Sequence, residues 1–372
     1  MVRGVPLRAA LLGAGAAFVL ALGPATAQDM KAEVDALKKR VAELESGTSV
    51  TISGYVKGDF YIDSHDDLGN TFTFNNPIRL DGQAGDDAED GAVGAHATQS
   101  RIRLSSSTDT DFGALSTVVE GDFNPYGATR LRLRLAYGAL GPVVAGQAWS
   151  IRGDNHTFAD TVEFDGPVGV VATRTPQLRL TLPLGAGFTG QMAVERAIGG
   201  NEVPTFLAAL RYSAGWGAVN LTGSVGQYED GAGQSETTHT LHVGAHVKAT
   251  DATKVMATLN MQRGDGQIYG SAGAIGTDAS GDLTAYDSIG GFAGVSHGWS
   301  DSIRSGVFFG WVENDNPGMA LDKTRQTVHA NVIWSPVPQA DIGFEVIYGS
   351  RETNAGATGE ATRFQIGVKY GF

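Results

Sequence analysis

Arginine side chains recur at every second position in two short segments of the chain. Arg101 and Arg103 alternate with Ile102 and Leu104. The second segment repeats this pattern three times, with Arg130, Arg132 and Arg134 alternating with Leu131, Leu133 and Leu135. Because successive side chains of a β-strand point to opposite faces, each segment would present guanidinium groups on one face and apolar groups on the other. A row of fixed positive charges of this kind would attract small anions.

The residue types that most enzymes and metal sites require are scarce. The chain has no cysteine, which excludes disulfides, thiolate catalysis and cysteine-based metal sites. Its eight histidines are scattered, and neither a Gly-x-Ser-x-Gly nor a His-Glu-x-x-His motif occurs. The formal net charge of −13 argues against nucleic-acid binding, which needs a basic surface. We therefore predict a protein without catalytic activity, cofactor or metal.

The first residues have the pattern of an export signal. Arg3 and Arg8 are followed by an uncharged apolar stretch from Ala9 to Leu22, and Ala25-Thr26-Ala27 supplies the small residues that a signal peptidase reads. The apolar stretch is short for a membrane anchor. We predict a cleaved signal peptide at residues 1–27 and a mature protein in the bacterial cell envelope.

A heptad pattern follows at residues 28–46. Its apolar positions are spaced alternately four and three residues apart: Met30, Val34, Leu37, Val41 and Leu44. This seam predicts a helix, and charges of opposite sign at the g and e positions favour a coiled coil over a solitary amphipathic helix. About two heptads cannot hold a complex alone, so the part of the chain that follows must set the oligomer number.

From residue 50 onwards apolar and polar residues alternate. Phe364, Ile366, Val368, Tyr370 and Phe372 show this most clearly at the C-terminus. We predict sixteen strands, at residues 50–62, 97–107, 113–123, 130–139, 142–149, 176–184, 188–196, 204–213, 217–228, 237–249, 254–263, 286–297, 303–313, 325–335, 339–350 and 361–372. Odd-numbered connections are mostly long and even-numbered ones are tight, which is typical of a transmembrane β-barrel and not of a soluble sandwich.

A barrel in the outer membrane must close, because the bilayer core offers no water to unpaired backbone groups. The first and last strands should therefore pair. Aromatic residues near predicted strand ends would form the interfacial girdles: Phe60, Tyr137, Trp149, Tyr212, Trp216, Trp299, Trp311, Trp334 and Tyr348. About sixteen strands leave an aqueous channel, whereas eight leave a filled interior. The predicted fold is thus an all-β barrel that conducts small hydrophilic solutes.

An arginine on the lipid face would cost about 2 to 4 kcal/mol at the bilayer midplane, so the leucines should face lipid and the arginines the lumen. Arg174 and Arg179 extend this cluster. The long connection from Ser150 to Thr175 carries the acidic residues Asp160, Glu163 and Asp165. If it folds into the pore, its carboxylates would face the arginines and set a transverse field at a constriction. Alternatively, wall carboxylates such as Glu120, Asp122 and Glu195 neutralise the arginines without selecting any solute.

The predicted first external connection, Asp63 to Ala97, is strongly acidic. It contains eight acidic residues, Asp63, Asp66, Asp67, Asp81, Asp86, Asp87, Glu89 and Asp90, against a single Arg79. Divalent cations could bind there at the cell surface. The spacing matches no ligand template, however, so a solvated acidic loop is the preferred interpretation.

Three segments resemble the DcaP-like porins: Val50 to Phe60, Leu135 to Gly138, and Val144 to Ser150. The heptad segment is similar to theirs as well. The resemblance implies a trimer of sixteen-stranded barrels with a periplasmic N-terminal coiled coil. It implies an arginine-rich constriction, here Arg101, Arg103, Arg130, Arg132 and Arg134, that favours negatively charged solutes such as dicarboxylates. It also implies that Phe372 is part of the signal read by the barrel-assembly machinery.

Two other functions stay open at this point. A general porin would have weak or cation selectivity despite its arginines. A surface adhesin is suggested by the tripeptides Arg152-Gly153-Asp154 and Arg263-Gly264-Asp265, although such tripeptides arise readily by chance in glycine-rich loops.

Overall fold

The structure, a computed structural model, describes residue 35 and residues 47–64, 67–72, 78–83, 91–123, 126–127, 129–196, 203–278 and 280–372. The predicted signal peptide and, apart from Asp35, the heptad segment lie outside these residues. The strands are β1 (Ser49–Asp63), β2 (Ala92–His96), β3 (Arg101–Thr110), β4 (Gly113–Asp122), β5 (Arg132–Leu140), β6 (Val143–Trp149), β7 (Arg174–Gly185), β8 (Phe188–Glu195), β9 (Thr205–Ala214), β10 (Gly217–Glu229), β11 (Ser235–Lys248), β12 (Thr253–Arg263), β13 (Ile275–Thr277), β14 (Leu283–Ala285), β15 (Asp287–Gly298), β16 (Ile303–Asn314), β17 (Asp322–Val337), β18 (Ala340–Thr353) and β19 (Thr358–Gly371).

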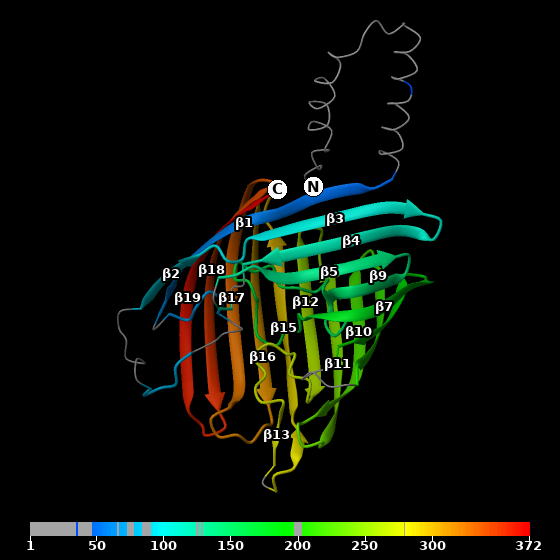
Figure 1. The fold of residues 1–372 in the computed structure, drawn as a ribbon. Helices are drawn as coiled ribbons and strands as arrows, with labels where there is room; N and C mark the ends of the chain where they lie inside the picture. The colour runs from blue at the N-terminus through cyan, green and yellow to red at the C-terminus, as the bar shows by residue number, and fades with distance from the viewer. Residues whose placement is uncertain are drawn as a thin grey trace, which may run out of the picture.

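The strands of the main sheet pair antiparallel in chain order and close into a ring (Figure 1). β1 pairs with β19 from Tyr55↔Gly371 to Asp63↔Arg363, so the first and last strands meet as predicted. On its other edge β1 pairs with β3 and then with β2, which therefore share one position in the wall. β13 and β14 form a separate hairpin. The seventeen strands of the main sheet thus make a closed wall of sixteen positions.

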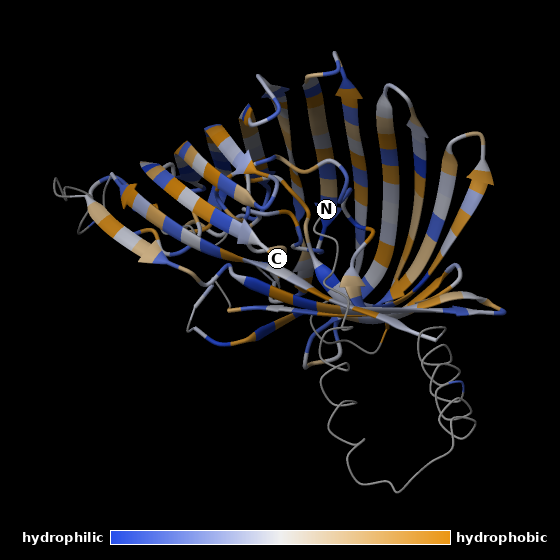
Figure 2. Ribbon diagram, turned by 90° about the horizontal axis from the view of Figure 1, so that it is seen from above, coloured by the Kyte–Doolittle hydropathy of each residue, from blue (hydrophilic) through white to orange (hydrophobic). Residues whose placement is uncertain are grey.

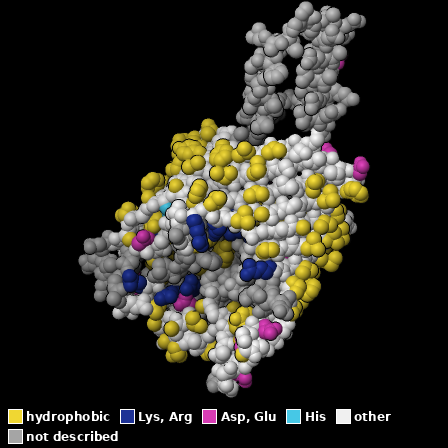
Figure 3. Space-filling view, in the orientation of Figure 1, with side chains coloured by type: hydrophobic (Ala, Val, Ile, Leu, Met, Phe, Trp, Pro, Cys, Tyr) yellow, Lys and Arg dark blue, Asp and Glu magenta, His cyan; other side chains and the backbone are white. Residues whose placement is uncertain are grey.

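The two faces of the wall differ in polarity. On β17, His329 and Asn331 are buried inside the barrel, whereas Val328 and Val332 are exposed on its outer face. Figure 2 shows the resulting alternation of apolar and polar bands along the strands, and Figure 3 shows apolar side chains spread over the outer surface. No helix in the described part of the chain is long and apolar enough to cross a membrane.

Short and long connections are sorted between the two ends of the barrel. Successive strands run in opposite directions, so every second connection lies at the same end. Seven connections of two to four residues lie at the end that holds the C-terminus: 111–112, 141–142, 186–187, 215–216, 249–252, 299–302 and 338–339. Most long connections lie at the opposite end, which carries the β13–β14 hairpin (Figure 1).

Part of the inner face is apolar and is covered by connections that fold inwards. Leu68, Phe72 and Ile78 from the β1–β2 connection pack on Ile347 and Ala361 of β18 and β19. Val170, from the connection between β6 and β7, packs on inward-facing side chains of β12, β15 and β16. The interior is therefore lined by two loops as well as by the wall.

A β-bulge changes the predicted alternation in β5. Glu120 of β4 pairs with Leu135 and Gly121 pairs with Leu133, which leaves Arg134 as the extra residue. Leu131 and Leu133 are 71% and 53% exposed on the outer face, but Leu135 is only 3% exposed. The prediction that Leu135 faces outwards is wrong, because one inserted residue moves every later side chain to the opposite face.

The girdle prediction needs two corrections. Tyr137 follows the bulge in β5 and pairs with the inward-facing Val118 of β4, so it faces the interior. Trp216, Trp299 and Trp334 are exposed on the outer face near the short connections. The Trp149 ring instead lies against Phe158, at 6.1 Å between ring centroids, and under the guanidinium groups of Arg134 and Arg174. Trp149 therefore faces the interior, because it is the last residue of β6 and leads into a connection that folds inwards.

A buried ion pair joins the two strands that close the ring. Nε and Nη2 of Arg363 on β19 lie 2.6 and 2.7 Å from the carboxylate oxygens of Asp63 on β1, and neither side chain is exposed. The same Nη2 donates to the carbonyl oxygen of Gly69 at 2.7 Å. The pair therefore holds both the seam and the start of the inward-folding connection.

We expect Arg363→Met to lower the free energy of unfolding by about 3 to 5 kcal/mol, because Asp63 would stay buried without its cation. Arg263→Met is the matched control, since the Arg263–Asp287 pair is exposed, and exposed pairs contribute about 0 to 1 kcal/mol. Urea unfolding in detergent micelles, followed by tryptophan fluorescence, would measure both. Equal unfolding midpoints for the two variants would show that the Arg363–Asp63 pair does not stabilise the seam more than an exposed pair does.

Candidate functional site

Six arginines from β3, β5 and β7 gather at one side of the barrel interior. They are Arg101, Arg103, Arg132, Arg134, Arg174 and Arg179. Ile102 and Leu104, which alternate with Arg101 and Arg103, are exposed on the outer face, as the alternation in β3 requires. Arg130 lies before the start of β5 and is exposed, so it stands outside this ladder.

Two carboxylates of β4 serve four of these arginines. Arg134 lies 2.8 Å from Glu120 and 3.0 Å from Asp122, and Arg132 lies 2.6 Å from Asp122. Arg101 and Arg103 are 3.5 and 3.7 Å from Glu120. Among the described residues, no carboxylate lies within 4.0 Å of Arg174 or Arg179. Six cations against two carboxylates leave a formal surplus of four positive charges in this cluster, or three if Asp165 is counted.

Aromatic rings fix the planes of the guanidinium groups. Arg132 lies 4.8 Å above the Tyr126 ring, and Arg174 lies 4.7 Å above the Trp149 ring. Arg134 is 5.5 Å from the Phe164 ring. Cation–π contacts within about 6 Å are attractive, and a guanidinium group held over a ring still donates hydrogen bonds through its edge, as Arg132 does to Asp122. The cluster is therefore a preorganised set of donors.

The connection between β6 and β7, residues 150–173, folds into the barrel. The amide of Val168 donates to Oγ1 of Thr327 on β17 at 3.1 Å, and Nδ2 of Asn260 on β12 donates to the Gly169 carbonyl at 2.7 Å. On the opposite side of the interior from these strands lies the arginine cluster, which this connection meets through Phe164. We call residues 150–173 the constriction loop.

The acidic residues of the constriction loop have separate partners. Asp160 pairs with Arg304 of β16 at 2.7 Å, and its backbone carbonyl accepts a hydrogen bond from Asn331 of β17. Asp165 accepts a hydrogen bond from the hydroxyl of Tyr126. Burial raises the pKa of that hydroxyl, which therefore remains protonated and can donate. Only Asp165 of the three predicted acids reaches the arginine side, so the structure does not bring the whole predicted set together.

Glu163 is buried where two loops meet. Its Oε1 accepts the amide of Phe72 at 3.0 Å, and its Oε2 accepts the amides of Asp165 and Gly166 at 2.7 and 2.8 Å. The amides of Val162 and Glu163 donate to Oε2 of Glu345 on β18 at 2.6 and 2.7 Å. Burial, together with the neighbouring Asp165 carboxylate, raises the pKa of Glu163 to about 8. Glu163 therefore holds the loop tip through three backbone amides.

Sequence reasoning missed the aromatic and buried partners of the site. Tyr126 precedes the arginine run of β5 by a few residues, and Phe164 lies between two predicted acids, but neither position forms part of a periodic pattern. Glu345 and His329, which are hydrogen-bonded at 2.9 Å, lie on the polar face of their strands as many other residues do. No local signal distinguishes a residue that binds a loop from one that faces water.

No protein-family model and no curated protein sequence matches the chain. Solved structures do match. The outer membrane channel DcaP of Acinetobacter baumannii aligns with a TM-score of 0.76 over 88% of this chain and 98% of that chain, at 22% sequence identity. The chain has the fold of a porin-type outer-membrane channel.

Other channels of this fold are less similar. An anion-selective porin from Comamonas acidovorans aligns with a TM-score of 0.60 at 12% identity, over 87% of this chain and 100% of that chain. The outer membrane protein OmpT of Vibrio cholerae aligns with a TM-score of 0.59 at 13% identity, over 87% of this chain and 98% of that chain. At such identities the likeness establishes the porin-type fold.

The raised pKa of Glu163 predicts a pH dependence of stability. The folded chain holds this proton more tightly than the unfolded chain, whose pKa is near the ordinary 4.5. The contribution of Glu163 to stability is thus complete below about pH 4.5 and is lost as the pH rises through about 8. Glu163→Gln should flatten the decline of the unfolding midpoint across this window, whereas Asp160→Asn, at a partly exposed site, should not. If the unfolding midpoint of Glu163→Gln declines as that of the wild type does, the titration of Glu163 is not the cause of the pH dependence.

Proposed function

We propose that the chain forms a water-filled diffusion channel for small hydrophilic solutes in the bacterial outer membrane, and that its arginine cluster favours anions. The observation that carries the proposal is the surplus of positive charge beside the constriction loop, inside a closed wall whose outer face is apolar. A wall of sixteen positions encloses more space than wall side chains fill, so a wet lumen is expected. The porin-type fold supports this interpretation.

Anion preference follows from charge and geometry. Fixed charges act more strongly in a narrow passage with low-dielectric walls than in bulk water, so a local surplus raises the concentration of counter-ions. Guanidinium groups bind carboxylates through two parallel N–H donors. Arginines on three strands, β3, β5 and β7, could contact both ends of a short dicarboxylate. We therefore propose small dicarboxylates among the permeant solutes.

A general porin with weak or cation selectivity is the second candidate. Glu120 and Asp122 compensate part of the cluster, and the net charge of the whole chain is −13. The adhesin hypothesis has less support. Arg152, Asp154 and Asp265 of the two Arg-Gly-Asp tripeptides are buried, so an external receptor could not reach them.

The assembly is also a proposal. We propose a homotrimer in which residues 28–46 form a coiled coil in the periplasm, after cleavage of a signal peptide at residue 27. A trimer form of OmpT from Vibrio cholerae shares the barrel fold with this chain. Phe372, whose amide and carbonyl pair with Gly54 at 3.1 Å, has an exposed ring on the outer face. That ring is accessible for binding by the barrel-assembly machinery.

Planar-bilayer recording tests the channel and its selectivity. We expect stepwise conductance, in groups of three for a trimer, and a reversal potential of anion sign in a salt gradient. The double variant Arg132→Gln, Arg134→Gln removes two positive charges. We expect its anion-to-cation permeability ratio to fall roughly fivefold at low salt, since a permeating ion passes within a Debye length of both arginines.

The matched control is Arg263→Gln with Lys323→Gln. It removes the same net charge from exposed strand ends outside the pore and should leave the ratio unchanged. A reversal potential that is the same in both double variants would exclude the arginine cluster as the selectivity filter. The absence of conductance steps from a folded wild-type barrel would exclude the channel.

A further inference from the structure

A buried ionic cluster lies at the root of the constriction loop. Arg152, the third residue of the loop, is 2% exposed. Its Nη1 lies 2.6 Å from Oε2 of Glu195, at the end of β8, and its Nε lies 3.1 Å from Oδ2 of Asp265, in the connection that follows β12. Ser150 also donates to Glu195, at 2.9 Å. One guanidinium group thus links the loop to the wall and to another connection.

The returning limb of the constriction loop is joined to the same connection. Val171 and Ile268 are partners in an isolated antiparallel β-bridge. The amide of Tyr269 donates to the Val170 carbonyl, and the amide of Gly169 donates to the Tyr269 carbonyl, both at 2.8 Å. Both limbs of the loop are therefore attached to residues 264–274, which lead into the external β13–β14 hairpin.

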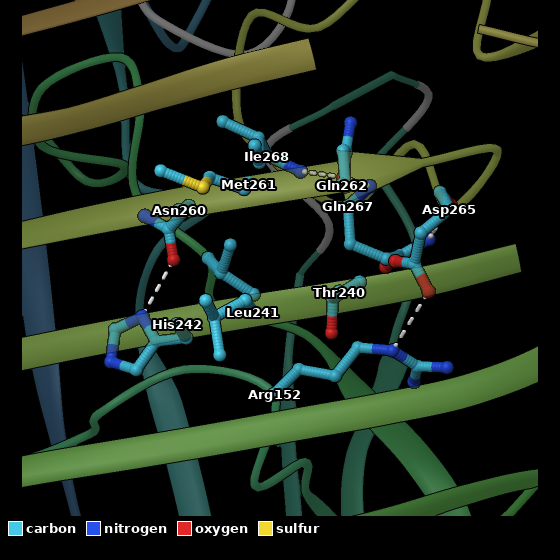
Figure 4. Close-up of a pocket in the computed structure, with 11 residues that line it drawn as sticks. Arg152, Thr240, Leu241, His242, Asn260, Met261, Gln262, Asp265, Gln267 and Ile268 are labelled. Atoms are coloured by element: carbon cyan, nitrogen blue, oxygen red, sulfur yellow. Dashed lines mark hydrogen bonds and ion pairs between the residues drawn. The ribbon is translucent and has the colours of Figure 1, made fainter. Parts of the chain in front are cut away.

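The cluster borders a small cavity of about 10 Å³, which polar and apolar side chains line together (Figure 4). Arg152, Gln262 and Asp265 line it, and their Nη2, Nε2 and Oδ1 atoms have no hydrogen-bond partner among the described residues. A cavity of this size fits one water molecule, and water can both accept from the two donors and donate to the carboxylate.

We propose that Arg152 is a positioning residue of the channel, which fixes both limbs of the constriction loop through residues 264–274 and so keeps the open pore at a constant width. This inference rests on the channel function proposed above. Removing the guanidinium group leaves two buried carboxylates without a cation, and a cost of this kind favours displacement of the loop towards water. Applied voltage would then move a loop that carries charged residues.

Single-channel recording of Arg152→Met tests the functional part. We expect the time spent in partly closed levels at moderate voltage to rise about tenfold or more, given the cost of unpaired buried charge. In the triple variant Arg152→Met, Glu195→Gln, Asp265→Asn, no charged group of the cluster stays buried without a partner. This variant should therefore fold even if the single variant does not. It should still show increased closure, because the ion pairs that attach the loop to Glu195 and Asp265 are lost. Arg263→Met is the control with an unchanged loop.

A disulfide provides the rescue. The chain has no cysteine, so Val171→Cys with Ile268→Cys introduces a single possible pair. Partners in an antiparallel bridge have Cα atoms about 4.5 to 5.5 Å apart, within the range that a disulfide spans. In the Arg152→Met background the oxidised pair should restore wild-type closure, and reduction should remove the rescue. In the same background, Val171→Cys alone should leave the increased closure unchanged.

Hydrogen exchange separates this inference from the proposed function. In folded barrels in detergent, amides of residues 150–173 should exchange faster in Arg152→Met than in wild type, and slowly again in the oxidised cysteine pair. The role of Arg152 would be overturned if both the single and the triple variant showed the amide exchange rates and the closure of the wild type. A wild-type barrel that does not conduct would overturn the channel proposal, and with it the inferred control of pore width.

Discussion

The structure depends on one constraint: a wall one sheet thick, with an apolar face outside and an aqueous space inside, must pair all of its backbone groups within itself. An open edge is not permitted, so the chain returns β19 to β1 and places a buried Arg363–Asp63 pair at that seam. The same constraint fixes the alternation of side chains. It is relaxed only at local defects, such as the break between β2 and β3 and the bulge at Arg134, where the register can shift by one residue without opening the ring.

The polar interior then has to accommodate charges that lipid would reject. The β4 carboxylates pair with arginines on both neighbouring strands, so two carboxylates hold four guanidinium groups against one section of the wall. They do not neutralise the cluster. The acids of the constriction loop are largely used elsewhere: Asp160 binds Arg304, and Glu163 accepts three backbone amides. Loop acids that attach the loop cannot also cancel the arginine surplus.

Local periodicity predicts the wall well and its contents poorly. The sixteen positions, the closure of the ring and the outward Ile102 and Leu104 all follow from a period of two that each strand carries in its own residues. Leu135 and Trp149 depart from it because a bulge and a strand end depend on neighbouring strands. Alternation does not predict the inward apolar residues Ile347 and Phe308 either, since the loops that pack on them come from distant parts of the chain. The contact of Val162 with Glu345 spans 183 residues, and no pattern near either residue indicates it.

Selectivity by fixed charge requires a fixed distance, because the energy of a permeating ion near an arginine changes steeply over a few ångströms. Apolar contacts alone are non-directional and would allow the constriction loop to slide along the inner wall. Buried hydrogen-bonded ion pairs contribute little net stability but tolerate little displacement, since a shift leaves charge unpaired in a low-dielectric site. Arg152 at the root and Glu345 at the tip hold the loop in this way at its two ends. In the proposed channel, the arginine cluster therefore supplies the charge, and the anchors of the loop keep the passage beside that charge at a constant width.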